Sequence, residues 1–181
     1  MTRYVETSLA GVVVLEPDPF EDERGLFVRT WDTSEAEARG MDTRLSQCST
    51  SYNRHRGTLR GLHFQAHPFS ESKLVRCTAG AIYDVAVDLR SGSPTRLTWF
   101  GTELTAQNRR SLYIPEGCAH GFVTLTDGAE VFYQISAPYV PEAARVVRWD
   151  DPAFDIDWPI SPVVMSERDS SCAEFAEATL Q

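Results

Sequence analysis

The chain has 181 residues, of which 42% are hydrophobic and 24% are charged, and its net charge is −9. This length predicts one domain over residues 1–181, and the composition is ordinary for a globular protein. The acidic balance argues against nucleic acid as a partner, because a phosphate backbone needs a basic protein surface. One small phosphorylated ligand stays open, since a few local arginines and lysines are enough to bind it.

Neither a membrane span nor a secretion signal is expected. The apolar run at residues 11–15 has the length of a strand, far short of the roughly 18 residues that a membrane helix needs. Residues 1–7 lack a basic region followed by a long apolar core, so we expect a cytoplasmic protein. The four cysteines are widely spaced, which favours free thiols in a reducing compartment over disulfides or a zinc site.

Short apolar runs separated by Gly, Pro, Asp and Asn predict a chain made mostly of strands. Residues 82–89 alternate in polarity, with Asp84 and Asp88 on one face, which is typical of a half-buried strand. Regular strand spacing with little helix predicts an all-β sandwich or barrel. In chain order we expect a strand at 12–15, turns at 16–25, a strand at 26–31, a short helix at 32–40, strands at 45–52, 58–65, 73–78, 82–89, 97–104, 111–114, 121–126, 131–135 and 145–149, and a candidate short helix at 174–180.

The chemistry centres on residues 56–65, where Arg60 and His63 lie in a strand-like run that contains two glycines. Arg60 keeps its charge and suits a phosphate or carboxylate, whereas His63 can take and return a proton near neutral pH. For His63 alone, a structural histidine bonded to a backbone carbonyl is an equal alternative. Lys73 at the start of the next strand and His120 beside Gly121 favour the functional interpretation.

Three further candidates have an ordinary structural alternative. Tyr133 lies in an apolar run where most tyrosines pack, but an inward-facing phenol could donate a proton. Tyr139 lies in a stiff loop flanked by prolines, where its ring could stack on a nucleobase. Asp169 would usually be a solvated charge, and the sharper hypothesis is a carboxylate that orients a catalytic histidine.

The chain carries six ordered motifs, at residues 22–25, 56–65, 73–76, 84–90, 113–122 and 148–152. Together they resemble the dTDP-4-dehydrorhamnose 3,5-epimerases, the RmlC-like cupins that act on nucleotide-linked 4-keto-6-deoxy sugars. The resemblance implies an all-β cupin jelly-roll barrel with short peripheral helices, a homodimer, and no metal or coenzyme. It implies His63 as the base, Asp169 as its hydrogen-bonding partner and Tyr133 as the acid on the opposite face of the sugar. The resemblance extends over residues 11–169.

The implied chemistry also follows from the residue types. A proton next to a ketone can be abstracted when a cation such as Lys73 stabilises the enolate, and the base should titrate near the working pH. Arg60 and Arg24 suit a diphosphate. The resemblance implies substrate contacts at Arg24, Gln47, Ser49, Arg60, Lys73, His120 and Arg168, with Tyr139 stacking on the base.

Three positions depart from the family pattern. Arg29 and Ala144 stand where Glu is frequent, and Ser49 stands where Asn is usual. These positions lie among ligand contacts rather than in the acid–base pair, so they leave the base and the sugar open, including a nucleotide sugar other than a dTDP sugar.

The leading hypothesis is an epimerase that acts at C3, at C5 or at both carbons of a nucleotide 4-keto-6-deoxyhexose. The alternatives are a 3,4-ketoisomerase of the same sugar class, a non-catalytic sugar-nucleotide-binding cupin, and a metal cupin oxygenase. Metal cupins usually carry His-x-His, whereas His63 is followed by Phe64 and Gln65, so the metal signal is weak.

Overall fold

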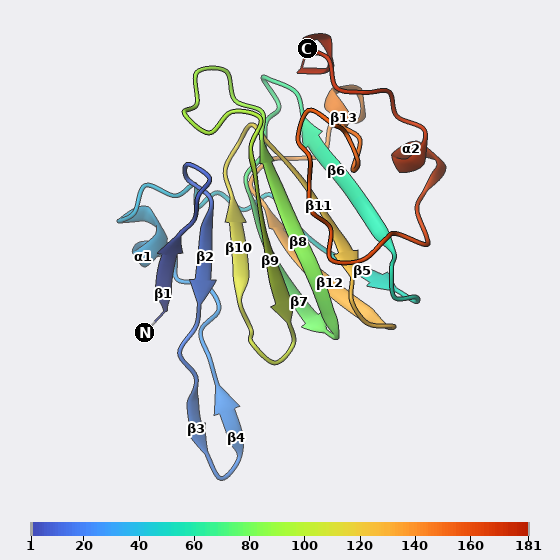
Figure 1. The fold of residues 1–181 in the computed structure, drawn as a ribbon. Coiled ribbons are helices and arrows are strands. Elements are labelled where there is room, and N and C mark those ends of the chain that lie inside the picture. The colour runs from blue at the N-terminus through green and yellow to red at the C-terminus, as the bar shows by residue number, and fades with distance from the viewer. Residues whose placement is uncertain (1, 181) are drawn as a thin grey trace.

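The computed structural model describes residues 2–180 and consists mostly of strands (Figure 1). Its short helices are α1 (Thr33–Glu37) and α2 (Glu167–Ser170), with the 3₁₀ turns η1 (Pro141–Ala143) and η2 (Glu177–Leu180). The strands are β1 (Arg3–Glu6), β2 (Val13–Glu16), β3 (Phe20–Asp22), β4 (Gly25–Phe27), β5 (Gln47–Asn53), β6 (Leu59–Gln65), β7 (Lys73–Ala79), β8 (Ala81–Asp88), β9 (Trp99–Thr105), β10 (Ser111–Ile114), β11 (Cys118–Thr124), β12 (Ala129–Ile135) and β13 (Ala144–Val146).

Two antiparallel sheets form the body of the molecule. The larger sheet has the strand order β1-β2-β10-β7-β12-β5, and the smaller has the order β13-β6-β11-β8-β9. From β5 to β13 the chain passes back and forth between the two sheets, except that β8 and β9 are neighbours in the smaller sheet, and the predicted all-β architecture is confirmed. Side chains such as Val75, Leu112 and Phe122 fill the space between the sheets.

The C-terminal segment covers the outer face of the smaller sheet. Phe154 packs with Leu62, Val85 and Val87 in a second apolar cluster. Figure 1 shows this segment crossing over β6 and carrying α2 to the same side of the molecule. Strand β8 is therefore buried on both faces, and the half-buried strand predicted from its alternation is wrong. Asp84 and Asp88 are both fully buried.

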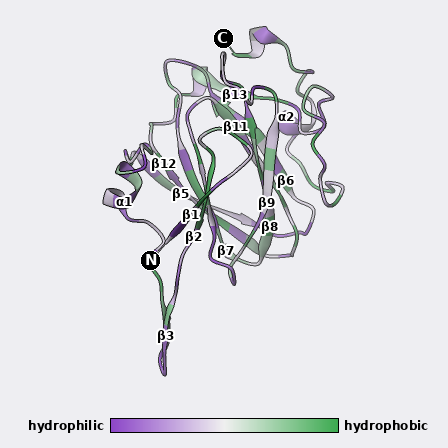
Figure 2. Cartoon of the chain, turned by 60° about the vertical axis from the view of Figure 1, so that its left-hand side comes forward, coloured by the Kyte–Doolittle hydropathy of each residue, from purple (hydrophilic) through white to green (hydrophobic). Residues whose placement is uncertain are grey.

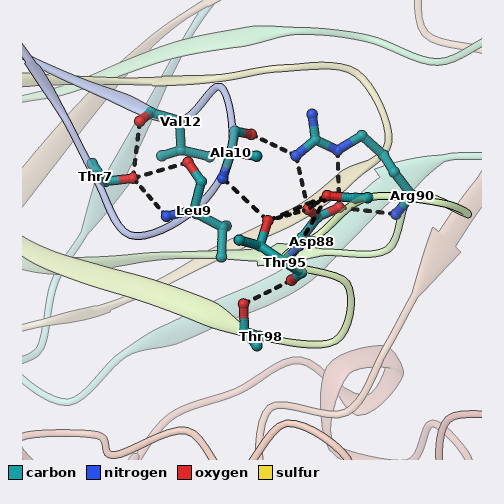
Figure 3. A network of polar contacts seen from close by, with 9 residues as sticks. Thr7, Leu9, Ala10, Val12, Asp88, Arg90, Thr95 and Thr98 are labelled. Carbon is teal, nitrogen blue, oxygen red and sulfur yellow. Dashed lines mark hydrogen bonds and ion pairs between the residues drawn. The ribbon is translucent and has the colours of Figure 1, made fainter.

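Asp88 is buried because a polar network surrounds it (Figure 3). Burial alone would raise the pKa of its carboxyl, but hydrogen bonds from Arg90, Ser93 and Thr95 outweigh that effect and lower the pKa. Arg90 also donates to the carbonyl oxygen of Ala10 at 2.5 Å. Asp88 thus ties the β8–β9 loop to the turn between β1 and β2.

The N-terminal region differs most from its predicted elements. Strand β1 was not predicted, and the expected turn and strand at 16–31 form instead a hairpin of β3 and β4. Figures 1 and 2 show this hairpin standing clear of the barrel. Its Phe20 and Phe27 are 66% and 71% exposed. The expected helix at 32–40 is present but shorter, with Asp32 as its N-cap.

The remaining elements follow the predictions with shifted bounds. Strand β13 is shorter than the expected 145–149, β11 begins at Cys118 rather than at Gly121, and the helix at 174–180 is a 3₁₀ turn. The cysteines are free, as predicted, and burial raises the pKa of the Cys77 thiol to about 11 and that of Cys118 to about 12. Within residues 2–180 no helix is both long and apolar enough to cross a membrane, and the cytoplasmic location stays a prediction.

Candidate active site

A partly open cavity of about 310 Å³ lies between the two sheets. Strands β5, β7 and β12 supply its wall from the larger sheet, and β6 and β11 supply the wall from the smaller sheet. Nine of the predicted site residues line it, and they are Gln47, Ser49, Arg60, His63, Lys73, His120, Tyr133, Tyr139 and Arg168.

An extra residue in β6 brings Arg60 and His63 to the same wall. Residues three apart on a regular strand face opposite sides. His63 pairs with His120 and Arg60 pairs with Phe122, so β6 uses one residue more than β11 between the two pairs. This bulge places the side chains of Arg60 and His63 on the same face of the strand. The strands are so close there that a Cβ on Gly61 would lie 2.5 Å from the Gly121 Cα.

The predicted pair of His63 and Asp169 is formed. His63 Nε2 lies 2.7 Å from Asp169 Oδ1, and the N–H of Gly61 donates to Oδ2 at 3.3 Å. Burial alone would raise the pKa of Asp169, but these hydrogen bonds outweigh it and hold the pKa below its ordinary value. An ionised carboxylate only accepts, so Nε2 carries the proton and Nδ1 is left as the basic nitrogen.

A second histidine–carboxylate pair lies beside the first. His120 Nε2 is 2.8 Å from Asp84 Oδ1, and the two side chains are only 5% and 0% exposed. Sequence reasoning missed Asp84 as a site residue, because its alternation with apolar neighbours was assigned to a half-buried strand. The available signal was a carboxylate in the middle of an apolar run, which a buried strand tolerates only with a partner.

Tyr133 reaches the cavity from the sheet opposite to His63. Its phenol oxygen is 3.2 Å from Ser51 Oγ, and its ring meets the His120 ring edge-on at 6.1 Å between centroids. Burial raises the pKa of Tyr133 well above its ordinary value of 10, against a smaller opposing effect of the Ser51 hydrogen bond. The phenol is therefore neutral at physiological pH and can donate a proton.

Lys73 provides a cation inside the cavity. Its ammonium group is 3.0 Å from Glu71 Oε1 and donates to the carbonyl oxygen of His63 at 3.2 Å. The side chains of Lys73 and Glu71 are only 9% and 11% exposed, so water screens this pair weakly. Glu71 was missed in the sequence because nothing about its spacing distinguishes it from a surface charge.

Two arginines connect the cavity to a neighbouring hollow behind His63. Arg60 and Arg168 line both spaces, and the hollow also contacts Ser166 and Asp169. Arg60 donates through Nε to Asn53 Oδ1 at 2.7 Å. Within residues 2–180 neither arginine makes an ion pair, so both guanidinium groups can bind an anion.

Comparison with known proteins identifies the family. A sequence model of the dTDP-4-dehydrorhamnose 3,5-epimerases matches residues 6–177. The chain belongs to this family. It is 44% identical over 175 residues to the dTDP-4-dehydrorhamnose 3,5-epimerase of Sinorhizobium fredii, an alignment that covers 96% of this chain and 90% of the relative. The resemblance seen in the sequence and the assignment to this class of isomerases are thereby confirmed.

Solved structures agree with this assignment. The crystal structure of the Elizabethkingia anophelis dTDP-4-dehydrorhamnose 3,5-epimerase superposes with a TM-score of 0.94 at 36% identity, covering 98% of each chain. A Legionella pneumophila epimerase in complex with dTDP-4-keto-L-rhamnose gives a TM-score of 0.92 at 35% identity and covers 99% of this chain and 97% of that one. The cupin jelly-roll fold implied by the resemblance is confirmed.

Two of the three departures from the family pattern line the cavity. Ser49 and Ala144 both contribute to its wall, and their small side chains leave space there. Arg29 lies outside the cavity, where its guanidinium pairs with Asp32 at 3.0 Å. The departures at Ser49 and Ala144 are therefore the two that alter the cavity wall itself in this epimerase-family chain.

Arg24 is the predicted contact that the fold does not bring to the cavity. It lies on the turn of the β3–β4 hairpin, where its side chain is 88% exposed and pairs with Asp22. Its role as a substrate contact stays a prediction for this epimerase-family chain. Within residues 2–180 no cluster of three or more His, Cys, Asp or Glu side chains is arranged to hold a metal ion.

Proposed function

We propose that this chain epimerises a dTDP-linked 4-keto-6-deoxyhexose at C3 and C5. The observation that carries the proposal is the position of His63 and Tyr133 on opposite sheets around one cavity. A base on one side of a sugar ring and an acid on the other side are what inversion at a carbon requires. The activities named for the family relatives support the same reaction.

The reaction begins with proton removal by His63. Asp169 orients the imidazole, and Nδ1 takes the proton from the carbon next to the C4 ketone. The electron pair of the broken C–H bond forms a C=C bond to C4, and the π electrons of the C4=O bond move onto the oxygen, which becomes an enolate oxyanion. The Lys73 ammonium stabilises this negative charge in a cavity that water screens weakly.

Inversion is completed from the opposite face. Tyr133 donates its phenolic proton to the carbanionic carbon, and the enolate returns to a ketone with inverted configuration. His63 then holds one extra proton and Tyr133 lacks one, and solvent exchange through the cavity mouth restores both. The same sequence can operate at C3 and at C5, since both carbons flank the C4 ketone.

The remaining contacts suit a nucleotide sugar. Arg60 and Arg168, which make no ion pair within residues 2–180, can bind the diphosphate through their guanidinium groups. Tyr139 is 56% exposed at the cavity lining, where its ring can stack on the base. With these contacts, one bound nucleotide sugar would extend from the cavity floor to its mouth, with the diphosphate between the sugar and the base.

We also propose a homodimer in which the hairpin of β3 and β4 reaches a second copy. The hairpin carries Arg24 away from its own cavity and exposes Phe20 and Phe27. An exposed pair of this kind is typical of an interface. Mixing equal amounts of His63→Ala and Arg24→Ala subunits tests this dimer. Half of the randomly assembled dimers would contain one subunit of each kind, and each of these would have one intact site out of two. About a quarter of wild-type activity would then return. Without any recovery, Arg24 does not act across an interface.

The reaction is tested by proton NMR in deuterated water with dTDP-4-keto-6-deoxyglucose. We expect deuterium at C3 and C5 with inversion at both carbons, and no exchange above background with His63→Ala. Uptake at one carbon only would identify a monoepimerase, and a shifted carbonyl would identify a ketoisomerase. Tight binding without any exchange would identify a binding protein, and metal-dependent oxygen consumption would identify an oxygenase. Each of these outcomes contradicts the proposed double epimerisation.

A further inference from the structure

Gln65, the last residue of β6, connects two loops through a buried carboxamide. The residue is 3% exposed and lines the cavity. Its Nε2 donates to the carbonyl oxygens of Phe69 at 2.9 Å and Pro138 at 3.1 Å. Its Oε1 accepts the N–H of Val140 at 2.6 Å. Both donor hydrogens and the acceptor oxygen of one side chain are thereby used on backbone groups of two different loops.

Each of the two loops contributes a residue to the cavity lining, Glu71 from the loop after β6 and Tyr139 from the loop after β12. The loop after β6 carries Phe69, which is 47% exposed, and the loop after β12 carries Tyr139, which is 56% exposed. The loops are also joined at their base, because Ser72 N donates to Ser136 Oγ at 2.8 Å and Ser136 N donates to Ser72 O at 3.1 Å. Gln65 adds contacts on both sides of Tyr139, at Pro138 and Val140.

We propose that Gln65 is a positioning residue that holds the Tyr139 ring in the orientation needed to receive the base of the substrate. The inference rests on the proposed function, in which Tyr139 stacks on that base. Gln65 does not touch the reacting carbons in this scheme. Its effect reaches the substrate through the backbone on either side of the ring.

The three hydrogen bonds together require a carboxamide side chain at position 65. Two carbonyl oxygens need donors and one N–H needs an acceptor, which the carboxamide supplies in a fixed arrangement. Gln65→Met keeps the length of the side chain but leaves all three backbone groups without that partner. Gln65→Glu keeps the acceptor and, when ionised, places negative charge against the oxygens of Phe69 and Pro138. Unpaired buried groups are costly, so the loops are expected to move in either variant.

The test measures binding of thymidine diphosphate by calorimetry, together with kcat and KM for the keto sugar. We expect Gln65→Met and Tyr139→Ala each to weaken nucleotide binding about tenfold, in the range of one lost base–aromatic stack. Because Gln65 acts through Tyr139, the double variant should bind within about twofold of Tyr139→Ala alone. KM should rise about tenfold while kcat stays within about threefold of wild type. Gln107→Met, in an exposed turn, is the matched control and should change nothing.

Several outcomes overturn the proposal. Additive effects, about 100-fold in the double variant, would show that Gln65 acts independently of Tyr139. A loss in kcat with unchanged KM would place its effect in the chemistry. Unchanged nucleotide binding in either single variant would also refute it. Should Gln65→Met unfold, Gln65→Glu takes its place, and unfolding of both would assign Gln65 a structural role instead. Wild-type protein that binds the nucleotide but exchanges no sugar proton would refute the proposed function alone.

Discussion

Replacing Tyr133 with Phe isolates the acid step of the proposed reaction. The change removes one oxygen atom and keeps the ring that packs against His120. The stability cost should be small, since the lost hydrogen bond to the part-buried Ser51 contributes about 1 kcal/mol. A positioned general acid contributes about 10²–10⁴ in rate, so inversion should fall to about 1% of wild type or less.

The same substitution should separate exchange from inversion. His63 still removes the proton in Tyr133→Phe, and in deuterated water it can return a deuteron to the face from which the proton left. NMR should therefore detect deuterium at C3 and C5 with retained configuration, at a rate less reduced than that of inversion. The wild-type phenol is protonated at neutral pH, and burial raises its pKa further above the ordinary value.

Two results would refute this reasoning. Inversion within about fivefold of wild type would mean that another group supplies the proton, because the loss would lie far below that of a general acid. Equal loss of exchange and inversion would mean that the phenol serves binding or enolate formation instead. Tyr52→Phe is the matched control, since Tyr52 lies on the neighbouring β5 but is 60% exposed, and its activity should be unchanged.

Three further substitutions test the base, the cation and the fold. Asp169→Asn should lower kcat roughly 10²-fold or more. The pKa of Asp169 is lowered from 3.8 in the folded protein, so its ionised form stabilises the fold above about pH 4. The difference in Tm between wild type and Asp169→Asn should therefore narrow as the pH falls through the lowered pKa. Lys73→Met should slow turnover roughly 10²–10³-fold while the Kd for thymidine diphosphate changes less than about threefold. Gly61→Ala should lower the free energy of unfolding in urea by about 3 kcal/mol or more, because its methyl would meet the Gly121 Cα. Gly92→Ala, also at a positive φ but in open space, should cost only about 1–2 kcal/mol.

The strands that carry the site were predictable because their signals are local. Short apolar runs and flanking turn residues mark β6, β7 and β12 near the positions that the structure gives them. The chemical candidates were predictable too, since Arg60, His63 and Lys73 occur in runs that match the family motifs. Their roles stay predictions, because the geometry brings the groups together without showing the reaction.

What the sequence could not reveal depends on contacts between distant segments. Asp84 reads as one face of a half-buried strand until the C-terminal segment is seen to cover the opposite face of the smaller sheet. Glu71 becomes a site residue only because its carboxylate meets Lys73 in a weakly screened space. The hairpin of β3 and β4 stands clear of the barrel with Phe20 and Phe27 exposed, and its local sequence pattern does not show that placement.

The bulge at Gly61 links the fold to the chemistry. Arg60 and His63 would face opposite sides of a regular strand, and only one of them could line the cavity. The extra residue of β6 turns both inward, and it fits because Gly121 lets the two backbones approach closely. A slip of β11 by one residue would turn His120 out of the cavity and away from Asp84. Gly61 and Gly121 therefore allow Arg60, His63 and His120 to line the same cavity.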